Sequence, residues 1–203
     1  MFDNHRLDST HLITLKSFPR INTMLARCVK IALFSALVGT FAYSVKAEDG
    51  PALLKKDAGT WNCEVKMFTD STSPPAVSKG IETNVMIGDL WIVSHFKGSI
   101  MDMDFEGSSQ TGYDVKTKKF VGSWVDSMSP NPMKTEATWD EKTQTKTSTG
   151  VSKDPNDNEM KHRMTTVYNA DGTRSFTMFG IVNGSEVKMM EIKYTKVAAK
   201  AAK

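Results

Sequence analysis

Apolar and polar side chains alternate along most of the chain from residue 61 onward. Between residues 61 and 67 the apolar Trp61, Cys63, Val65 and Met67 are separated by single polar residues. A period of two is typical of a β-strand with one buried face. Similar runs predict nine further strands, at residues 80–87, 90–97, 100–113, 119–127, 134–139, 144–151, 159–169, 173–182 and 186–196.

Turn-forming residues separate these runs. The dipeptides at 88–89, 171–172 and 183–184 are Gly-Asp, Asp-Gly and Asn-Gly, of which the last two strongly favour tight hairpins. Proline-containing stretches at 73–75 and 130–132 break the pattern and indicate longer connections. Parallel strands need crossovers of a dozen or more residues, and the runs lie too close together for them. The strands are therefore expected to form an antiparallel meander.

A meander of about ten strands has two exposed edges unless it closes on itself, and closure into a barrel removes both edges. Helical periodicity is weak, apart from residues 51–56, which begin at a proline and are followed by Gly59 as a stop signal. The sequence thus predicts an all-β fold: an antiparallel up-and-down β-barrel of about ten strands with a short N-terminal helical turn.

The N-terminal region differs from the rest of the chain. Residues 31–45 are apolar and uncharged, and this run of 15 residues is short for a membrane span, which needs about 20. Arg27 and Lys30 precede it, and small residues stand at positions −3 and −1 relative to a cut after Ala47. This arrangement predicts a secretory signal peptide. An uncleaved N-terminal anchor is the alternative interpretation.

These features divide the chain into four segments. Residues 1–23 are expected to be an upstream extension, or else a long basic region of the signal, and residues 24–47 the signal peptide. Residues 48–197 are predicted to form a single barrel domain, and residues 198–203 a polar tail that frays. The mature protein is then exported, to the periplasm or the extracellular medium, and has no membrane span after signal cleavage.

Removal of the signal changes the charge balance. The whole chain has 26 basic and 23 acidic residues, but six of the basic and only two of the acidic ones lie in residues 1–47. The remaining 20 basic and 21 acidic residues give no electrostatic reason to expect nucleic-acid binding. Cys63 is then the sole cysteine, so an intrachain disulfide is excluded. Burial is the favoured interpretation, and a bridge between two chains is the alternative; the oligomeric state is left open.

Short motifs connect the chain with a known family. Residues 59–61, Gly-Thr-Trp, resemble the G-x-W entry of the calycin barrels, the lipocalins and their relatives, in which the tryptophan plugs the closed end. Residues 112–114 (GYD), 122–127 (GSWVDS) and 189–194 (MMEIKY) resemble an exported bacterial family known as domain of unknown function 1579. The resemblance covers roughly residues 50–196. It implies a lipocalin-like barrel and carries no established activity, so no catalytic residue is transferred.

A barrel of this size can enclose one small molecule. Trp124 and Asp126 lie two residues apart and share a strand face, as do Trp91 and His95. An apolar cavity with a few placed polar groups suits a small apolar or amphipathic ligand. The residues predicted to line the lumen and contact such a ligand are Trp91, His95, Tyr113, Trp124, Asp126, His162 and Phe179.

Two other kinds of site are weighed against this one. Met160, His162 and Met164 project from one strand face, and thioether and imidazole ligands suit copper, above all Cu(I), or one axial position on a haem iron. Methionine is also a frequent filler of irregular cores, so no metal or cofactor is predicted. Asp102 and its neighbours Asp104 and Glu106 could bind calcium, although a solvated outer face explains the same pattern.

An enzyme is the remaining alternative. Only His95 and His162 follow the predicted signal, and either could act as a general base beside a carboxylate inside the barrel. The sequence contains no phosphate-binding loop, no H-E-x-x-H zinc motif and no G-x-S-x-G nucleophile elbow. An enzyme is therefore less favoured than a binding protein.

Overall fold

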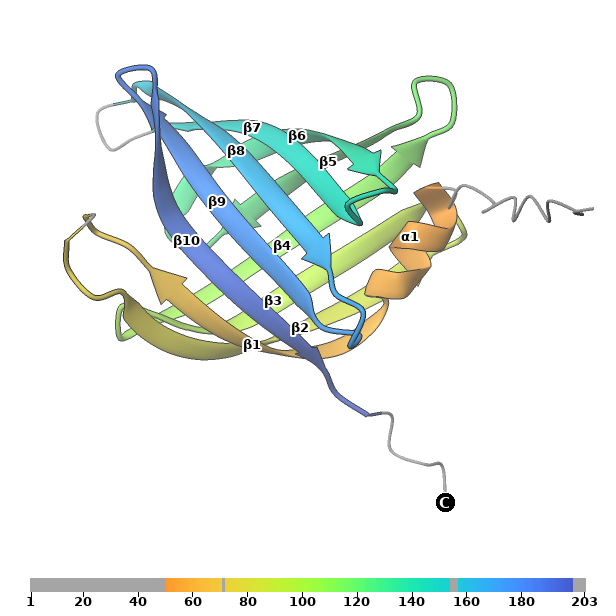
Figure 1. Cartoon of the computed structure of the whole chain (residues 1–203), viewed down its shortest axis with the longest axis horizontal. Helices are drawn as coiled ribbons and strands as arrows, with labels where there is room; N and C mark the ends of the chain where they lie inside the picture. The colour runs from red at the N-terminus through yellow and green to blue at the C-terminus, as the bar shows by residue number, and fades with distance from the viewer. Residues whose placement is uncertain (1–49, 71, 154–156, 199–203) are drawn as a thin grey trace, which may run out of the picture. The chain divides into compact units, whose positions relative to one another are not determined.

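The computed structural model describes residues 50–70, 72–153 and 157–198. The predicted signal, its upstream extension and nearly all of the predicted tail lie outside the described residues. In the described part, one helix precedes ten strands that close into an antiparallel barrel (Figure 1). The elements are α1 (Gly50–Asp57), β1 (Gly59–Met67), β2 (Ala76–Ile87), β3 (Trp91–Ile100), β4 (Met103–Asp114), β5 (Lys119–Asp126), β6 (Ser129–Asp140), β7 (Thr145–Lys153), β8 (Glu159–Tyr168), β9 (Arg174–Val182) and β10 (Ser185–Lys196).

Each strand pairs with its neighbours in the sequence, and β1 pairs with β10 to close the ring. The predicted fold class, an all-β up-and-down barrel with a short N-terminal helix, is confirmed. The tight turns follow from local chemistry: Asn183 and Gly184, between β9 and β10, both have positive φ angles, of 52° and 79°. Glycine and asparagine tolerate that backbone region, which two-residue hairpins require.

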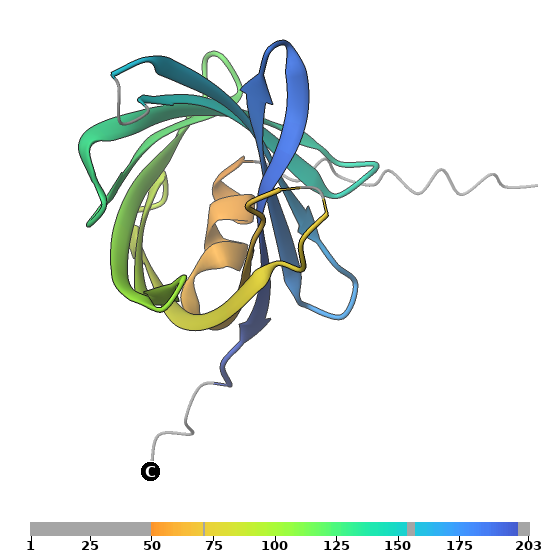
Figure 2. The same cartoon turned by 90° about the vertical axis from the view of Figure 1, so that its left-hand side faces the viewer.

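Helix α1 lies across one end of the barrel, as the view along the barrel shows (Figure 2). Leu53 and Leu54 are each 1% exposed and pack with Ile92 and Phe120 of the barrel interior. Trp61, two residues into β1, donates a hydrogen bond from Nε1 to the backbone oxygen of Asp57 at 2.9 Å. The helix and the tryptophan together close this end, which we call the closed end.

A second apolar cluster lies further along the barrel interior, where β1 meets β10. Val65 and Cys63 are fully or almost fully buried there, beside Phe96 and Ile192. Burial raises the pKa of the Cys63 thiol to about 12, with the nearby Glu82 carboxylate adding to the effect. The expected burial of Cys63 is therefore confirmed, and its thiol stays protonated at neutral pH.

The start of β6 differs from the sequence-based expectation. Residues 130–132 (Pro-Asn-Pro) were expected to form a longer connection, but they belong to the strand. Two local features accommodate the prolines. The β5–β6 pairing has a bulge between Trp124 and Asp126, and the β6–β7 pairing begins only at Lys134. Prolines are tolerated at such positions because no ladder hydrogen bond from their nitrogen is needed.

In the described residues no helix is long and apolar enough to cross a membrane.

Candidate functional site: the barrel cavity

The interior holds a cavity of about 470 Å³. It extends from Asp57, the last residue of α1, to Met128 and Lys153 at the opposite end, which we call the open end. Its volume lies within the range of about 300–1,000 Å³ that is usual for small-molecule sites. Most of its wall is apolar, and six of its residues are methionines: Met67, Met128, Met133, Met164, Met178 and Met190.

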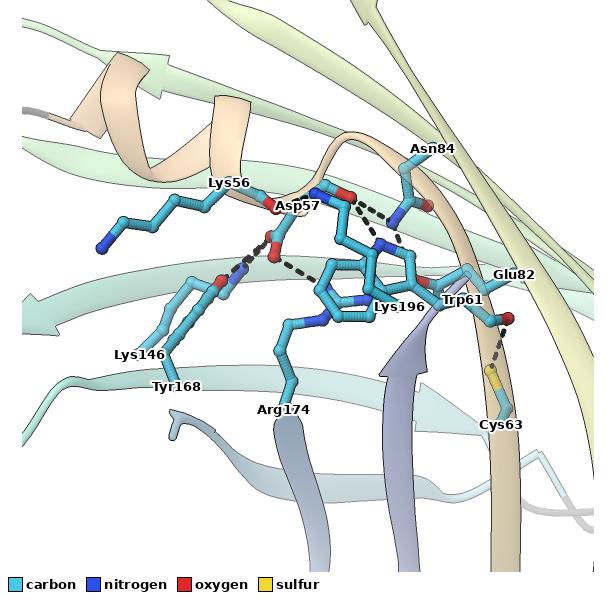
Figure 3. A network of polar contacts seen from close by, with 10 residues as sticks. All are labelled: Lys56, Asp57, Trp61, Cys63, Glu82, Asn84, Lys146, Tyr168, Arg174 and Lys196. Carbon is cyan, nitrogen blue, oxygen red and sulfur yellow. Dashed lines mark hydrogen bonds and ion pairs between the residues drawn. The ribbon is translucent and has the colours of Figure 1, made fainter. Parts of the chain in front are cut away.

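A buried ion-pair network forms the floor of the cavity at the closed end (Figure 3). Arg174, the first residue of β9, donates from Nη1 to Asp57 Oδ1 at 2.7 Å and from Nη2 to Glu82 Oε1 at 2.8 Å. Its guanidinium stacks between the rings of Trp61 and Tyr194, with centroids 4.1 and 4.3 Å away. One arginine thus connects α1, β2 and the aromatic residues of β1 and β10.

Further contacts complete this network. Lys146 Nζ lies 3.5 Å from Asp57 Oδ2, and Tyr168 donates its hydroxyl to the same oxygen at 2.9 Å. Asn84 donates to Glu82 Oε1 at 2.8 Å. The floor therefore contains two cations and two carboxylates, whose charges balance.

Burial and the neighbouring charges together govern the ionisation of Arg174 and Tyr168. Burial alone lowers the pKa of Arg174, but the adjacent Asp57 and Glu82 carboxylates outweigh it and the net shift is upward. Burial raises the pKa of Tyr168, and the negative charge of Asp57 raises it further. Arg174 therefore stays charged and Tyr168 stays neutral across the physiological pH range.

Polar groups of a different kind lie toward the open end. Asp126 Oδ2 accepts a hydrogen bond from Trp124 Nε1 at 2.8 Å, and its Oδ1 accepts one from the backbone nitrogen of Met128 at 2.9 Å. The Trp124 ring stacks on Phe105 with centroids 6.4 Å apart. Asp126 therefore fixes the orientation of an indole that forms part of the cavity wall.

His162 of β8 lies near the same end and is 5% exposed. Its Nε2 lies 2.7 Å from Ser152 Oγ, while Nδ1 is buried without a hydrogen-bond partner among the described residues. Burial lowers the pKa of His162 below its ordinary value of 6.5. The imidazole is therefore neutral at neutral pH.

The structure brings three of the seven predicted site residues into the cavity wall: Trp124, Asp126 and His162. Tyr113 also lies inside the barrel, but at the closed end, where it packs on Phe120 with ring centroids 5.1 Å apart and belongs to the cluster around α1. It supports the helix and does not line the cavity.

The other three predicted residues lie on the outer face of the barrel, so the expectation that they face the lumen is wrong. Trp91 is 43% exposed and covers Gly112 of the neighbouring strand. His95 points outward, and its Nε2 lies 2.9 Å from Glu106 Oε1 on the neighbouring strand. Phe179 lies outside under the guanidinium of Arg163, which is 4.3 Å from its ring centroid.

A common physical reason underlies these three errors. A period of two shows which residues share a face but not which face points inward. Trp91 and His95 do share a face, and the inward residues of β3 are Ile92, Ser94 and Phe96. Large aromatic residues stand on both faces of these strands, so size alone could not assign the inward face.

The structure also shows where the residues of the calcium-site and enzyme alternatives lie. Asp102 lies in the β3–β4 turn with a φ angle of 63°, separate from the exposed strand residues Asp104 and Glu106. In the described ranges no group of three or more His, Cys, Asp or Glu side chains is arranged to hold a metal ion. The histidine–carboxylate pair expected of an enzyme occurs at His95, outside the cavity, whereas His162 contacts Ser152.

The floor network is the main feature that sequence reasoning missed. Asp57 and Arg174 are 117 residues apart, and neither lies in a recognisable motif. No local signal marks them: Arg174 is separated from the Asp171–Gly172 turn by one residue, and arginine and aspartate are rarely fully buried.

The closed ten-stranded barrel, the tryptophan at its closed end and the internal cavity define a lipocalin-like barrel protein. The sequence model of the family described as "Protein of unknown function (DUF1579)" matches residues 36–196, and the chain belongs to that family. A search of curated proteins finds no match.

Proposed function

We propose that the protein is an exported carrier or receptor that binds one small apolar or amphipathic molecule inside its barrel. The observation that supports this most strongly is the internal cavity of about 470 Å³ with a largely apolar wall. If filled with water, a space of this size would hold roughly fifteen molecules at about 30 Å³ each. Replacement of that water by an apolar ligand is favourable in proportion to the apolar area that is covered.

The side chains of the cavity wall can adapt to the shape of a ligand. Methionine is unbranched and polarisable, so it adapts to ligands of irregular shape. Six methionines and several aromatic rings, among them Phe96, Trp124 and Phe176, contribute to the wall. An acyl chain or a flat ring system suits such a wall better than a sugar or a nucleotide.

The distribution of polar groups in the cavity supports one orientation of the ligand. The charges of Arg174 and Lys146 are already matched by Asp57 and Glu82, so the floor has no need of an ionic partner. At the open end, Asp126, Ser152 and Lys153 line the cavity close to solvent. The polar end of the ligand is therefore expected at the open end and its apolar end toward α1.

Thermal-shift screening tests binding, with fatty acids of increasing chain length, quinones and planar pigments as probes. The screen is repeated with two variants of adjacent residues on β7. Ser148→Phe directs a ring into the cavity, whereas Thr147→Phe places the same ring on the opposite face of the strand. Stabilisation of the wild type and Thr147→Phe, with loss of the effect in Ser148→Phe, is expected. No stabilisation by any probe, or an equal shift in both variants, would contradict the proposal.

Export is tested separately. Expression of the full-length chain in a Gram-negative host should give a periplasmic product whose mass corresponds to residues 48–203, as expected for cleavage after Ala47. Recovery of the uncleaved chain in the cytoplasm or the membrane fraction would contradict this part of the proposal.

A further inference from the structure

His162 occupies an unusual place in the sheet, because both of its cross-strand partners are glycines. It is registered with Gly150 on β7 and with Gly180 on β9. Residues paired in this way point to the same face, with Cβ positions about 4.5–5.5 Å apart. The imidazole therefore has a vacant side-chain position on each side.

Thioether sulfurs occupy both positions. Met133 Sδ lies 3.0 Å from the point where a Cβ of Gly150 would stand, and Met189 Sδ lies 2.6 Å from the corresponding point of Gly180. Met160 Sδ is 3.8 Å from that second point. Methionines of β6 and β10 thus fill the side-chain positions that the glycines of β7 and β9 leave beside His162.

The β10 methionine is directed there by an irregularity of the strand. The β9–β10 register shifts between Lys188 and Met190, so Met189 is the extra residue of a bulge. Bulges change the direction of a side chain that regular pairing would point elsewhere. In a regular strand Met189 and Met190 would point to opposite faces, whereas here Met190 lines the cavity and Met189 covers the inward face of Gly180.

The histidine itself has an unused nitrogen. Nδ1 is buried without a partner among the described residues, and leaving a buried polar atom unpaired is unfavourable. When Nε2 carries the proton and donates it to Ser152 Oγ, Nδ1 has a free lone pair. Histidines that bind metals commonly donate their other ring N–H in this way, which fixes the tautomer.

We propose that this site binds one Cu(I) ion through His162 Nδ1 and the sulfurs of Met133 and Met189, with Met160 as a fourth donor. Thioether and imidazole ligands select Cu(I), whereas calcium and magnesium need oxygen ligands. The donors are neutral, which suits a monovalent ion. The site differs from the sequence-based trio Met160, His162 and Met164, because two of its sulfurs come from other strands.

Anaerobic titration with Cu(I) in competition with bicinchoninate tests the proposal on the purified protein without added apolar ligand. One Cu(I) per chain is expected, with sulfur and nitrogen neighbours in the X-ray absorption spectrum. Met133→Leu and Met189→Leu should each weaken binding at least about tenfold, and Met103→Leu, an exposed methionine on β4, should leave it unchanged. Leucine nearly preserves the side-chain volume, so these variants are expected to fold.

Absence of stoichiometric binding would overturn the proposal, as would equal affinity in the wild type and in Met133→Leu and Met189→Leu. A circular dichroism spectrum unchanged from the wild type shows that each variant is folded before it is titrated. Failure here is distinguishable from failure of the proposed function, because binding of apolar probes is judged by Ser148→Phe, which is not one of the copper ligands.

Discussion

At the scale of single residues, Arg174 connects more parts of the barrel than any other side chain described above. It is almost fully buried, and its two carboxylate partners come from α1 and β2. A buried charge pair is weak evidence of net stability, but removal of one partner leaves the other charge buried and unpaired. The role of Arg174 is therefore tested best by a substitution that removes its charge.

Arg174→Met keeps an apolar side chain between Trp61 and Tyr194 but leaves Asp57 and Glu82 short of a cation. The free energy of unfolding, measured with urea, should fall by about 3–5 kcal/mol. The matched control is Arg163→Met, which removes an exposed ion pair with Glu186 and should cost much less. Similar losses in both variants would contradict the role assigned to the floor network.

His162 gives a second prediction at this scale, in the pH dependence of stability. Its pKa in the folded protein is lowered by burial from 6.5, so the unfolded chain binds a proton at a higher pH than the folded one. The stability that His162 contributes is fully present above the pKa of the unfolded state, which is 6.5. It is lost as the pH falls from there toward the lower pKa of the folded state. The stability of the wild type relative to His162→Gln should therefore decrease as the pH is lowered through 6.5.

The control for this measurement is His95→Gln, which changes the exposed histidine on the outer face. Urea unfolding at several pH values in metal-free buffer gives the required free energies. A stability difference between wild type and His162→Gln that does not change with pH would contradict the burial of a neutral imidazole.

At the scale of elements, the positions of the strands could be predicted because their signals are local. Alternation located β1 and the later strands, and Asn183 with Gly184 marked a turn whose backbone angles require those residues. The start of β6 could not be predicted, because Pro130 and Pro132 are compatible with a strand only where pairing is absent. That condition depends on the bulge in the β5–β6 pairing between Trp124 and Asp126, which no local pattern shows.

Helix α1 stabilises the barrel, because two of its leucines are buried at the closed end. Leu54→Ala should lower the free energy of unfolding by about 2–5 kcal/mol, because it removes buried methyl groups and leaves a cavity. Leu90→Ala, in the exposed β2–β3 turn, is the matched control and should change stability by about 0.5 kcal/mol or less. Equal effects would show that α1 is not packed into the barrel.

At the scale of the whole molecule, closure of the barrel followed from the number of strands and the short turns between them. The identity of the side chains that face the interior could not be predicted in the same way. Trp124, Asp126 and His162 were predicted at the cavity and lie there, whereas Trp91, His95 and Phe179 lie outside. The floor of Asp57, Glu82, Lys146 and Arg174 exists only once distant strands are joined, so no stretch of sequence contains its signal.

The central claim is that the interior of the barrel receives an apolar guest. NMR of the protein with ¹³C-labelled methionine methyl groups tests it most directly, with dodecanoic acid or the best probe of the thermal screen as titrant. The methyl signals of Met133, Met164 and Met178, inside the cavity, should shift in a saturable manner, while that of the exposed Met103 stays in place. Unchanged interior signals at saturating probe, or shifts confined to Met103, would contradict the claim.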